Sequence, residues 1–119
     1  MEMTIQEVKQ LDKNSYQIID IRDDNEIAHG AIPGAVALKV EEIAENPLVD
    51  KSKKLVICCS RGKYSQEVVP ELIEKGLDAV SLKGGYIAWL MDLMREDQEK
   101  DISADVEKSI RKKFRKSIW

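Results

Sequence analysis

The sequence predicts an α/β fold in which helices cover both faces of a small parallel sheet. Two observations support this prediction. Segments that favour strands alternate with segments that favour helices along the 119 residues, an order typical of a parallel sheet. The run KLVIC at residues 54–58 is almost entirely apolar, as expected of a parallel strand buried on both faces. The length suits one domain with a modest hydrophobic core.

The first half of the chain begins with a predicted helix. Thr4 can cap the segment IQEVKQL, because Glu7 follows three residues later, at the spacing of a capping box. The segments that follow are a short strand rich in β-branched residues (16–21), a helix of one to two turns closed by Gly30 (23–30), a turn leading into a strand (32–38) and another short helix (39–46).

The second half begins with the apolar strand 54–58 and continues with a predicted helix, SQEVVPELIEKG, which ends at Gly76. Pro70 lies inside this helix, where a proline removes one backbone hydrogen bond and can cost about 3 kcal/mol. The helix either kinks at Pro70 or starts a second piece near it, and the sequence leaves both alternatives open. A short strand (79–82) and an amphipathic helix (86–94) complete the pattern.

Composition indicates a cytoplasmic protein. Hydrophobic residues make up 43% of the chain and charged residues 34%, and no apolar run approaches the roughly 20 residues of a membrane span. The N-terminus lacks the basic and apolar regions of a secretion signal. The chain has two cysteines, Cys58 and Cys59, and adjacent cysteines do not readily form a disulfide with each other. We therefore expect a reducing compartment and no contact with a membrane.

The C-terminal end differs in charge from the rest. Residues 103–119 carry six lysines and arginines against two carboxylates, a net charge of +4, whereas the whole chain has a net charge of −3. An apolar residue recurs every four positions from Ile102 to Phe114, which predicts one apolar face on a helix. We therefore divide the chain into a domain (1–100) and a basic amphipathic helical tail or linker (101–119). The tail either docks on the domain or contacts an RNA backbone through Lys108–Lys116.

The stretch ICCSRGKYS at residues 57–65 combines a cysteine with a short basic loop. Cys59 stands where the apolar strand ends and a helix is predicted to begin, and ligands of open α/β sheets gather at the carboxyl ends of strands. The N–H groups of a helix N-terminus, together with Arg61 and Lys63, favour a thiolate over a thiol. Gly62 permits a backbone turn that aims several amides at one point. This pattern predicts a cysteine of low pKa that faces an anion.

A structural interpretation competes with this one. Cysteine is among the most buried residue types, and at the end of a strand it commonly fills the core. Cys58 points to the opposite side of the strand from Cys59, and we expect it to be core filler.

Three motifs in this chain resemble those of the rhodanese family. The first is Asp20-x-Arg22, followed by Glu26-x-x-x-Gly30 and Ile32-Pro33-Gly34-Ala35; the second is the cysteine loop, with Gly62 three residues after Cys59; the third is Gly84-Gly85-x-x-Ala88-Trp89. Their order and spacing match the family over about residues 3 to 97. The resemblance implies a rhodanese-like sheet of about five parallel strands, flanked by helices on both faces and followed here by the C-terminal helical tail.

The motifs also depart from the family pattern. The position before Ile-Pro-Gly-Ala is commonly His, but here it is Ala31, and the one histidine, His29, lies two residues earlier. We expect His29 to be exposed rather than catalytic. The last loop position, often Arg, Ser or Thr, is Tyr64, which puts a preference for thiosulfate in doubt. Related phosphatases need the pattern Cys-x5-Arg. The residues five and six positions after Cys59 are Tyr64 and Ser65, and because neither is Arg, the bidentate phosphate clamp is missing.

The resemblance implies a sulfurtransferase that needs no metal and no cofactor. Cys59 would take sulfur as a persulfide from thiosulfate or a protein persulfide and pass it to a thiol, to cyanide or to a partner protein. The substrate-binding loop would be Ser60, Arg61, Gly62, Lys63 and Tyr64, and the structural residues would be Asp20, Arg22, Glu26 and Trp89. We expect Asp20, Arg22 and Glu26 to pair with one another.

Two other functions remain open. One is a sulfur-relay or binding module supplied by a cysteine desulfurase, and the other is a non-catalytic rhodanese-like regulatory domain. The segment SIRKKFRKSIW also resembles, more loosely, the part of certain tRNA 2-thiolation enzymes that leads into their ATP-pyrophosphatase domain. From that resemblance we expect a relay module that feeds such an enzyme and that is part of a longer protein.

Overall fold

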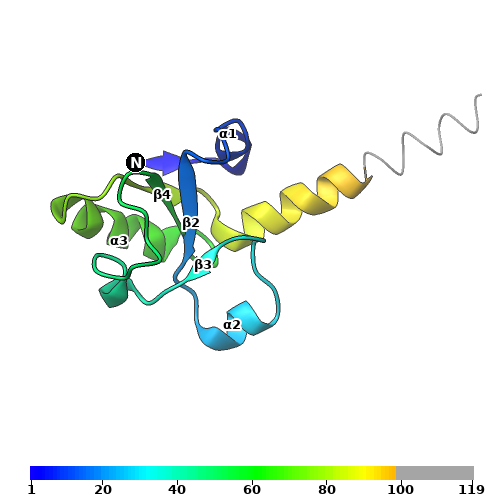
Figure 1. The fold of residues 1–119 in the computed structure, drawn as a ribbon. Helices are drawn as coiled ribbons and strands as arrows, with labels where there is room; N and C mark the ends of the chain where they lie inside the picture. The colour runs from blue at the N-terminus through cyan, green and yellow to red at the C-terminus, as the bar shows by residue number, and fades with distance from the viewer. Residues whose placement is uncertain (99–119) are drawn as a thin grey trace, which may run out of the picture. The chain divides into compact units, whose positions relative to one another are not determined.

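A computed structural model describes residues 1–98, and they contain a five-stranded sheet in the order β1-β5-β4-β2-β3, with all neighbouring strands parallel (Figure 1). The strands are β1 (Glu2–Met3), β2 (Tyr16–Asp20), β3 (Val36–Ala37), β4 (Lys54–Cys58) and β5 (Ala79–Leu82). The predicted parallel α/β fold is therefore confirmed. The sequence did not predict β1, whose two residues pair with Ser81 and Leu82 of β5.

The order of the strands creates a crevice between β2 and β4. The chain leaves β2 toward β3 on one side of the sheet, and it leaves β4 toward β5 on the other side. The register places Asp20, the last residue of β2, opposite Cys58, the last residue of β4. The segments that follow these two residues therefore diverge at the same edge of the sheet, which is where open α/β sheets bind ligands.

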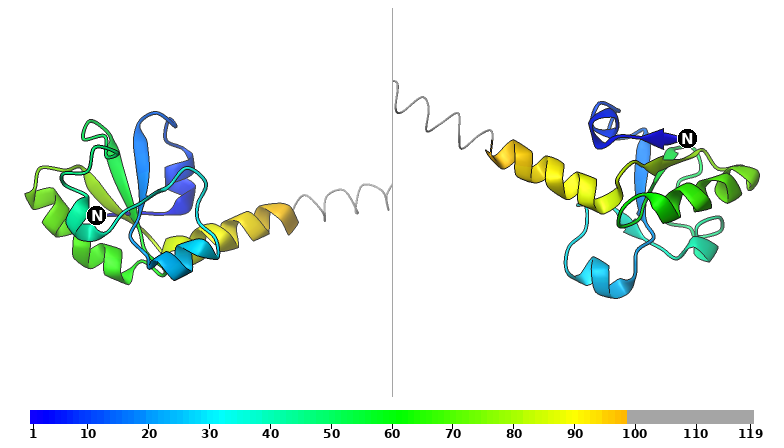
Figure 2. Two further views of the ribbon diagram at one scale, coloured as in Figure 1. Left: turned by 60° about the horizontal axis from the view of Figure 1, so that its bottom comes forward. Right: turned by 180° about the vertical axis from the view of Figure 1, so that it is seen from behind.

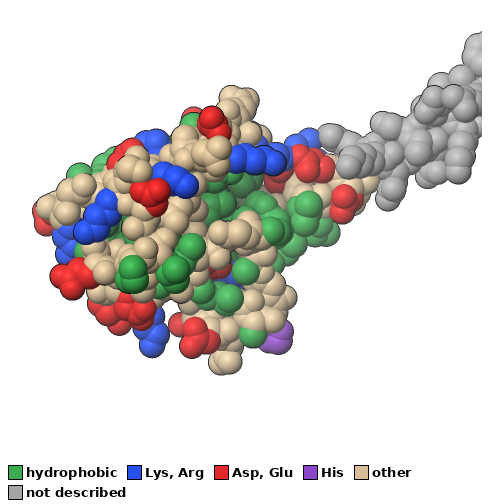
Figure 3. All heavy atoms as spheres, viewed as in Figure 1, with side chains coloured by type: hydrophobic (Ala, Val, Ile, Leu, Met, Phe, Trp, Pro, Cys, Tyr) green, Lys and Arg blue, Asp and Glu red, His purple; other side chains and the backbone are tan. Residues whose placement is uncertain are grey.

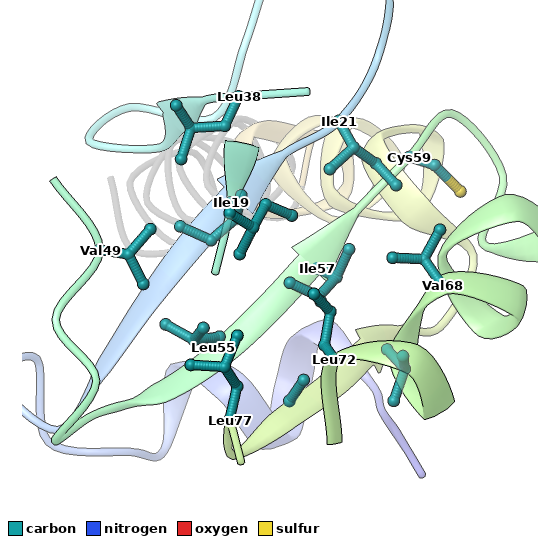
Figure 4. Packing of buried hydrophobic residues seen from close by; sticks show 13 residues of the cluster. Ile19, Ile21, Leu38, Val49, Leu55, Ile57, Cys59, Val68, Leu72 and Leu77 are labelled. Carbon is teal, nitrogen blue, oxygen red and sulfur yellow. The ribbon is translucent and has the colours of Figure 1, made fainter. Parts of the chain in front are cut away.

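Each face of the sheet carries its own apolar cluster. Alternation along β4 sends Leu55 and Ile57 to the face covered by α3 (Lys63–Glu74), where they pack with Val68 and Leu72 of that helix (Figure 4). Val56 points to the other face, into the cluster that contains residues of α1 (Ile5–Lys9). Figure 2 shows these two helices on opposite faces of the sheet. The predicted covering of both faces is thus confirmed.

Local signals account for most of the helix boundaries. Thr4 and Glu7 form the predicted capping box at the start of α1. The segment α2 (Asp24–Ala28) is a short helix, as predicted, whereas residues 39–46 form only a 3₁₀ turn, η1 (Val40–Glu42). The helix α3 continues past Pro70 to Glu74, so Pro70 does not divide it into two elements.

A last helix begins at residue 85 and is described to residue 98. The chain divides into two compact units, Met1–Trp89 and Leu90–Trp119, which we describe separately. Within the second unit, Arg95 forms an ion pair with Asp92 at 3.0 Å. The predicted boundary at residue 100 and the basic tail 101–119 lie outside the described residues and stay predictions. Among residues 1–98, no helix is both long enough and apolar enough to cross a membrane.

Candidate active site

Cys59 is the first residue after β4 and lies at the crevice between β4 and β2. Its side chain is 5% exposed and belongs to the apolar cluster on the α3 face, while that of Cys58 is fully buried in the cluster on the opposite face. Figure 4 shows the Cys59 sulfur directed toward the start of α3. The alternation predicted for the two cysteines is confirmed, and Cys58 is a core residue.

The Cys59 sulfur is surrounded by hydrogen-bond donors from the loop that follows it. The backbone N–H of Gly62 donates to the sulfur at 3.1 Å, and that of Ser65 donates at 3.4 Å. The Ser65 hydroxyl lies 3.3 Å from the same sulfur. A thiolate has no proton and only accepts hydrogen bonds, so this set of donors suits the charged form.

The two adjacent cysteines have opposite pKa shifts. Burial raises the pKa of the Cys58 thiol to about 12. Burial also acts to raise the pKa of Cys59, but hydrogen bonds from Ser65, Gly62 and the backbone of Arg61 outweigh it and lower that pKa below its ordinary value. Of the two cysteines, Cys59 is therefore the one whose surroundings favour the thiolate.

Gly62 makes the turn between the cysteine and α3. It stands at the N-cap of that helix with φ 90°, in the left-handed region that favours glycine. A Cβ atom at this position would lie 2.8 Å from the backbone nitrogen of Gly84, closer than real contacts allow. The turn therefore needs glycine both for its backbone angle and for its contact with the glycine pair 84–85.

Gly84 and Gly85 allow the last helix to pack closely against the loop that follows Cys59. The backbone N–H of Tyr86 donates to the Cys59 carbonyl at 2.8 Å, and that of Ile87 donates to the Ser60 carbonyl at 3.1 Å. A Cβ on Gly85 would lie 2.7 Å from the carbonyl carbon of Ser60. Because these two carbonyls at the start of the loop bond to the last helix, the loop is held in place. The amides of Gly62 and Ser65 can then face the sulfur. The motif around Gly84 and Gly85 thus shapes the loop.

The acidic and basic residues after β2 support the other wall of the crevice. Arg22 forms an ion pair with Asp20 at 2.8 Å, and both side chains are almost fully buried. Arg22 also donates to the carbonyl of Gly30 at 2.7 Å, and its guanidinium lies 3.9 Å from the ring centroid of Tyr86. A buried charge pair of this kind needs such extra partners, so the two residues fix the turn that follows β2.

Glu26 and Trp89 have different surroundings. Glu26 does not pair with Arg22 or Asp20, because its carboxylate accepts a hydrogen bond from the Ser60 hydroxyl. It therefore links α2 to the cysteine loop. Trp89 stacks on Tyr86 with 5.6 Å between ring centroids, in the apolar cluster of the α1 face. This contact agrees with the packing role expected of Trp89.

The remaining loop residues line a pocket of about 370 Å³ that also contains Cys59. Arg61, Lys63 and Tyr64 are exposed at this pocket, with Tyr64 51% exposed. Tyr64 also lines a neighbouring pocket of about 530 Å³, whose walls include Asp24, Glu41 and Glu42. Tyr64 therefore lines both the pocket that contains Cys59 and the neighbouring pocket that contains these carboxylates.

Two other site predictions concern His29 and metals. His29 is exposed, as expected, and caps the C-terminus of α2; it is the purple side chain at the surface in Figure 3. Within residues 1–98, no group of His, Cys, Asp or Glu side chains is arranged to hold a metal ion.

Two buried serines, one beside the sulfur and the other hydrogen-bonded to the first, are not predicted from the sequence. Ser65 of α3 and Ser81 of β5 are both fully buried, and their hydroxyl oxygens are 2.6 Å apart. The sequence predicts Ser65 only as the beginning of a helix, but its position six residues after Cys59, in the first turn of α3, is a signal that identifies it. No local signal marks Ser81.

A cysteine nucleophile in an amide-lined loop, at the crevice of a parallel sheet, defines a class of α/β enzymes that use cysteine for covalent catalysis. The profile of the rhodanese-like domain family matches residues 4–92. The chain therefore belongs to the rhodanese family.

Named relatives and solved structures agree with this assignment. The chain is 41% identical over 84 residues to the thiosulfate sulfurtransferase GlpE of Shewanella oneidensis, which covers 69% of this chain and 83% of that protein. It is 37% identical over 86 residues to GlpE of Pseudoalteromonas translucida, covering 71% and 82%. The crystal structure of a rhodanese-like domain protein from Staphylococcus aureus superimposes with a TM-score of 0.64 at 36% identity, covering 74% of this chain and 89% of the other.

Proposed function

We propose that this protein is a rhodanese-type sulfurtransferase in which Cys59 carries sulfur as a persulfide. The observation that carries the proposal is the pair of hydrogen bonds that the backbone N–H groups of Gly62 and Ser65 donate to the Cys59 sulfur. These bonds favour a thiolate in a site that is otherwise buried. The similarity to proteins named thiosulfate sulfurtransferase supports the same conclusion.

In the first step, the Cys59 thiolate attacks the outer sulfur of a donor. With thiosulfate, a new S–S bond forms at Cys59 while the S–S bond of thiosulfate breaks, and sulfite leaves with the bonding electron pair. Arg61 and Lys63 line the pocket over the sulfur, and their charges attract the anionic end of the donor. The amides of the loop stabilise the negative charge on the outer sulfur of the persulfide, in the manner of an oxyanion hole.

In the second step, an acceptor thiolate or cyanide attacks the outer sulfur of the Cys59 persulfide. The S–S bond to Cys59 breaks, the Cys59 thiolate is regenerated, and the acceptor leaves as a persulfide or as thiocyanate. This is a double displacement through a covalent intermediate. Its leaving group is the same thiolate that the loop stabilises, so a lowered pKa of Cys59 assists both attack and departure.

Mass spectrometry tests the proposal. We expect incubation with thiosulfate to add one sulfur atom to Cys59 and to release one sulfite per protein, and fragmentation of the peptide distinguishes Cys59 from Cys58. The variant Cys58→Ala should still form the persulfide, whereas Cys59→Ala should not. Persulfide formation by Cys59→Ala, or its loss in a folded Cys58→Ala variant, would refute the assignment.

A sulfur relay from a partner protein is a second candidate. The two adjoining pockets on either side of Tyr64 offer more space than a small anion such as thiosulfate needs, which favours a bulkier donor or acceptor. Transfer from a cysteine desulfurase persulfide that is much faster than transfer from thiosulfate would support the relay. Comparable rates for the two donors would favour a thiosulfate sulfurtransferase.

A further inference from the structure

The Ser65 and Ser81 hydroxyls form a polar pair in an otherwise apolar layer. Both residues are 0% exposed. Alternation along β5 places Ser81 on the same face as Ala79, which belongs to the apolar cluster packed against α3. A buried hydroxyl is costly unless it forms hydrogen bonds, and here each hydroxyl satisfies the other at 2.6 Å.

This pair is connected to the Cys59 sulfur. The Ser65 oxygen lies 3.3 Å from that sulfur and 3.3 Å from the carbonyl oxygen of Gly62. A hydroxyl has one proton to donate, and the Ser65 proton has three acceptors within reach: the sulfur, the Gly62 carbonyl and the Ser81 oxygen. Which of them receives it depends on the direction of the hydrogen bond between the two serines.

We propose that Ser81 is a positioning residue for the Cys59 sulfur: the Ser81 hydroxyl donates to Ser65, and the Ser65 hydroxyl then donates to the sulfur. In this arrangement, the Ser81 oxygen no longer competes for the Ser65 proton, and the two O–H dipoles align toward the negative charge. Hydrogen bonds in such a chain polarise and strengthen one another. A hydrogen bond to a charged acceptor is also stronger than one between neutral groups.

The pair can also follow a change in the charge of Cys59. When Cys59 is protonated, its S–H donates to the Ser65 oxygen, and the Ser65 proton turns to the Gly62 carbonyl or to Ser81. Only two hydroxyl rotations separate these arrangements, and neither requires water or movement of the backbone. Ser81 therefore acts on the sulfur through Ser65, across the interface between α3 and β5.

Ser81 is distinct from the charged groups that surround the sulfur. The pocket that holds Cys59 is lined by charged side chains from the segment after β2 and from the loop and α3, namely Arg22, Asp23, Glu26, Arg61 and Lys63, together with the titratable Tyr64. From β4, Cys58 is the neighbouring titratable group. Removal of the Ser81 hydroxyl leaves all of these in place, so an effect on Cys59 reports on the serine pair.

The test measures how fast Cys59 reacts with iodoacetamide as a function of pH, in the 119-residue chain carrying Cys58→Ala so that one thiol remains. We expect Ser81→Ala to raise the midpoint of this profile by about half a pH unit or more, which lowers the thiolate fraction below the midpoint about threefold. Ser65→Ala should raise it further. The double variant should match Ser65→Ala alone, since Ser81 has no route to the sulfur without Ser65. Val80→Ala, which shortens the neighbouring β5 side chain on the opposite face, should leave the midpoint unchanged.

A pair of variants with the same shape separates the hydroxyl from packing. Ser81→Thr retains a hydroxyl and Ser81→Val does not, so Thr should keep the original midpoint and Val should raise it. The proposal is overturned if Thr and Val give the same midpoint, if Ser81→Ala leaves the profile unchanged, or if the effects of Ser65→Ala and Ser81→Ala add in the double variant. The assay uses no sulfur donor, so a failure of the proposed sulfurtransferase activity would not affect its outcome.

Discussion

Substitution of Gly85 by alanine should damage the site without touching any side chain in it. Gly85 has φ 62°, in the left-handed region, where a residue with a Cβ costs about 1–2 kcal/mol. The added Cβ would also collide with the Cys59 carbonyl oxygen and lie 2.7 Å from the Ser60 carbonyl. The loop can relieve this collision only by moving away from the last helix.

The size of the effect follows from the hydrogen bonds that such a movement breaks. The N–H groups of Tyr86 and Ile87 bond to the carbonyls of Cys59 and Ser60, and each bond contributes roughly 1 kcal/mol to stability. When the cost of the left-handed backbone conformation is added to the loss of these two hydrogen bonds, Gly85→Ala should lower the free energy of unfolding by about 3 kcal/mol. The amides around the sulfur would be displaced as well, so alkylation of Cys59 at neutral pH should slow.

Gly76→Ala is the matched control for this prediction. Gly76 has φ 87°, but a Cβ there would meet no atom within 4 Å, so its substitution carries the backbone cost alone, about 1–2 kcal/mol. Urea denaturation gives the two free energies of unfolding, and alkylation gives the reactivity of Cys59, which Gly76→Ala should leave unchanged. If the two variants lose equal stability and keep equal Cys59 reactivity, the reasoning about contact between the helix and the loop is refuted.

Two further predictions concern Cys58 and Tyr64. Burial raises the pKa of Cys58 from 9.0 to about 12. Above pH 9, the unfolded chain therefore loses a proton that the folded chain keeps. As the pH rises, Cys58 should lower the free energy of unfolding by up to about 1.4 kcal/mol per pH unit. Urea denaturation between pH 8 and 11 should show this slope in the native chain and a smaller one in Cys58→Ala, and equal slopes would contradict it. Tyr64→Arg should add a cation at the mouth of the pocket. An attraction of about 0.5–1 kcal/mol between exposed charges should raise the rate of sulfite release from thiosulfate about two- to fivefold at low salt. This gain should be lost at high salt, where the charges are screened. An equal increase in Tyr64→Gln would instead indicate that the tyrosine ring blocks entry.

The fold was predictable where its signals are local. The capping box at Thr4, the apolar run of β4 and the glycine after α3 each lie within a few residues of the element they define. The strand β1 carries no such signal, because its two residues are fixed by pairing with β5, nearly the whole domain away in sequence. The segment after Lys39 has the composition of a helix, yet the structure forms only the 3₁₀ turn η1 there.

The same distinction separates the parts of the site. Cys59 and its loop form one continuous stretch, and a strand end followed by a turn and a helix is visible in the sequence. Ser81 contacts Ser65, the residue beside the sulfur, only because β5 lies beside β4 and α3 packs against both strands. Glu26 was expected to pair with its sequence neighbours, but its partner Ser60 is 34 residues away. Contacts of this kind depend on the packing of elements, which periodicity and spacing do not encode.

The two adjacent cysteines show how a sheet can give neighbouring residues opposite chemistry. Both thiols are buried, and burial alone would raise both pKa values. The difference arises because Cys58 still belongs to β4 and faces a layer of apolar side chains, while Cys59 has left the strand and faces the amides of the turn at Gly62. Moving the nucleophile back by one residue would place its sulfur among apolar neighbours on the wrong face of the sheet. The end of β4 therefore determines which cysteine faces hydrogen-bond donors that favour a thiolate, and the loop after β4 supplies those donors.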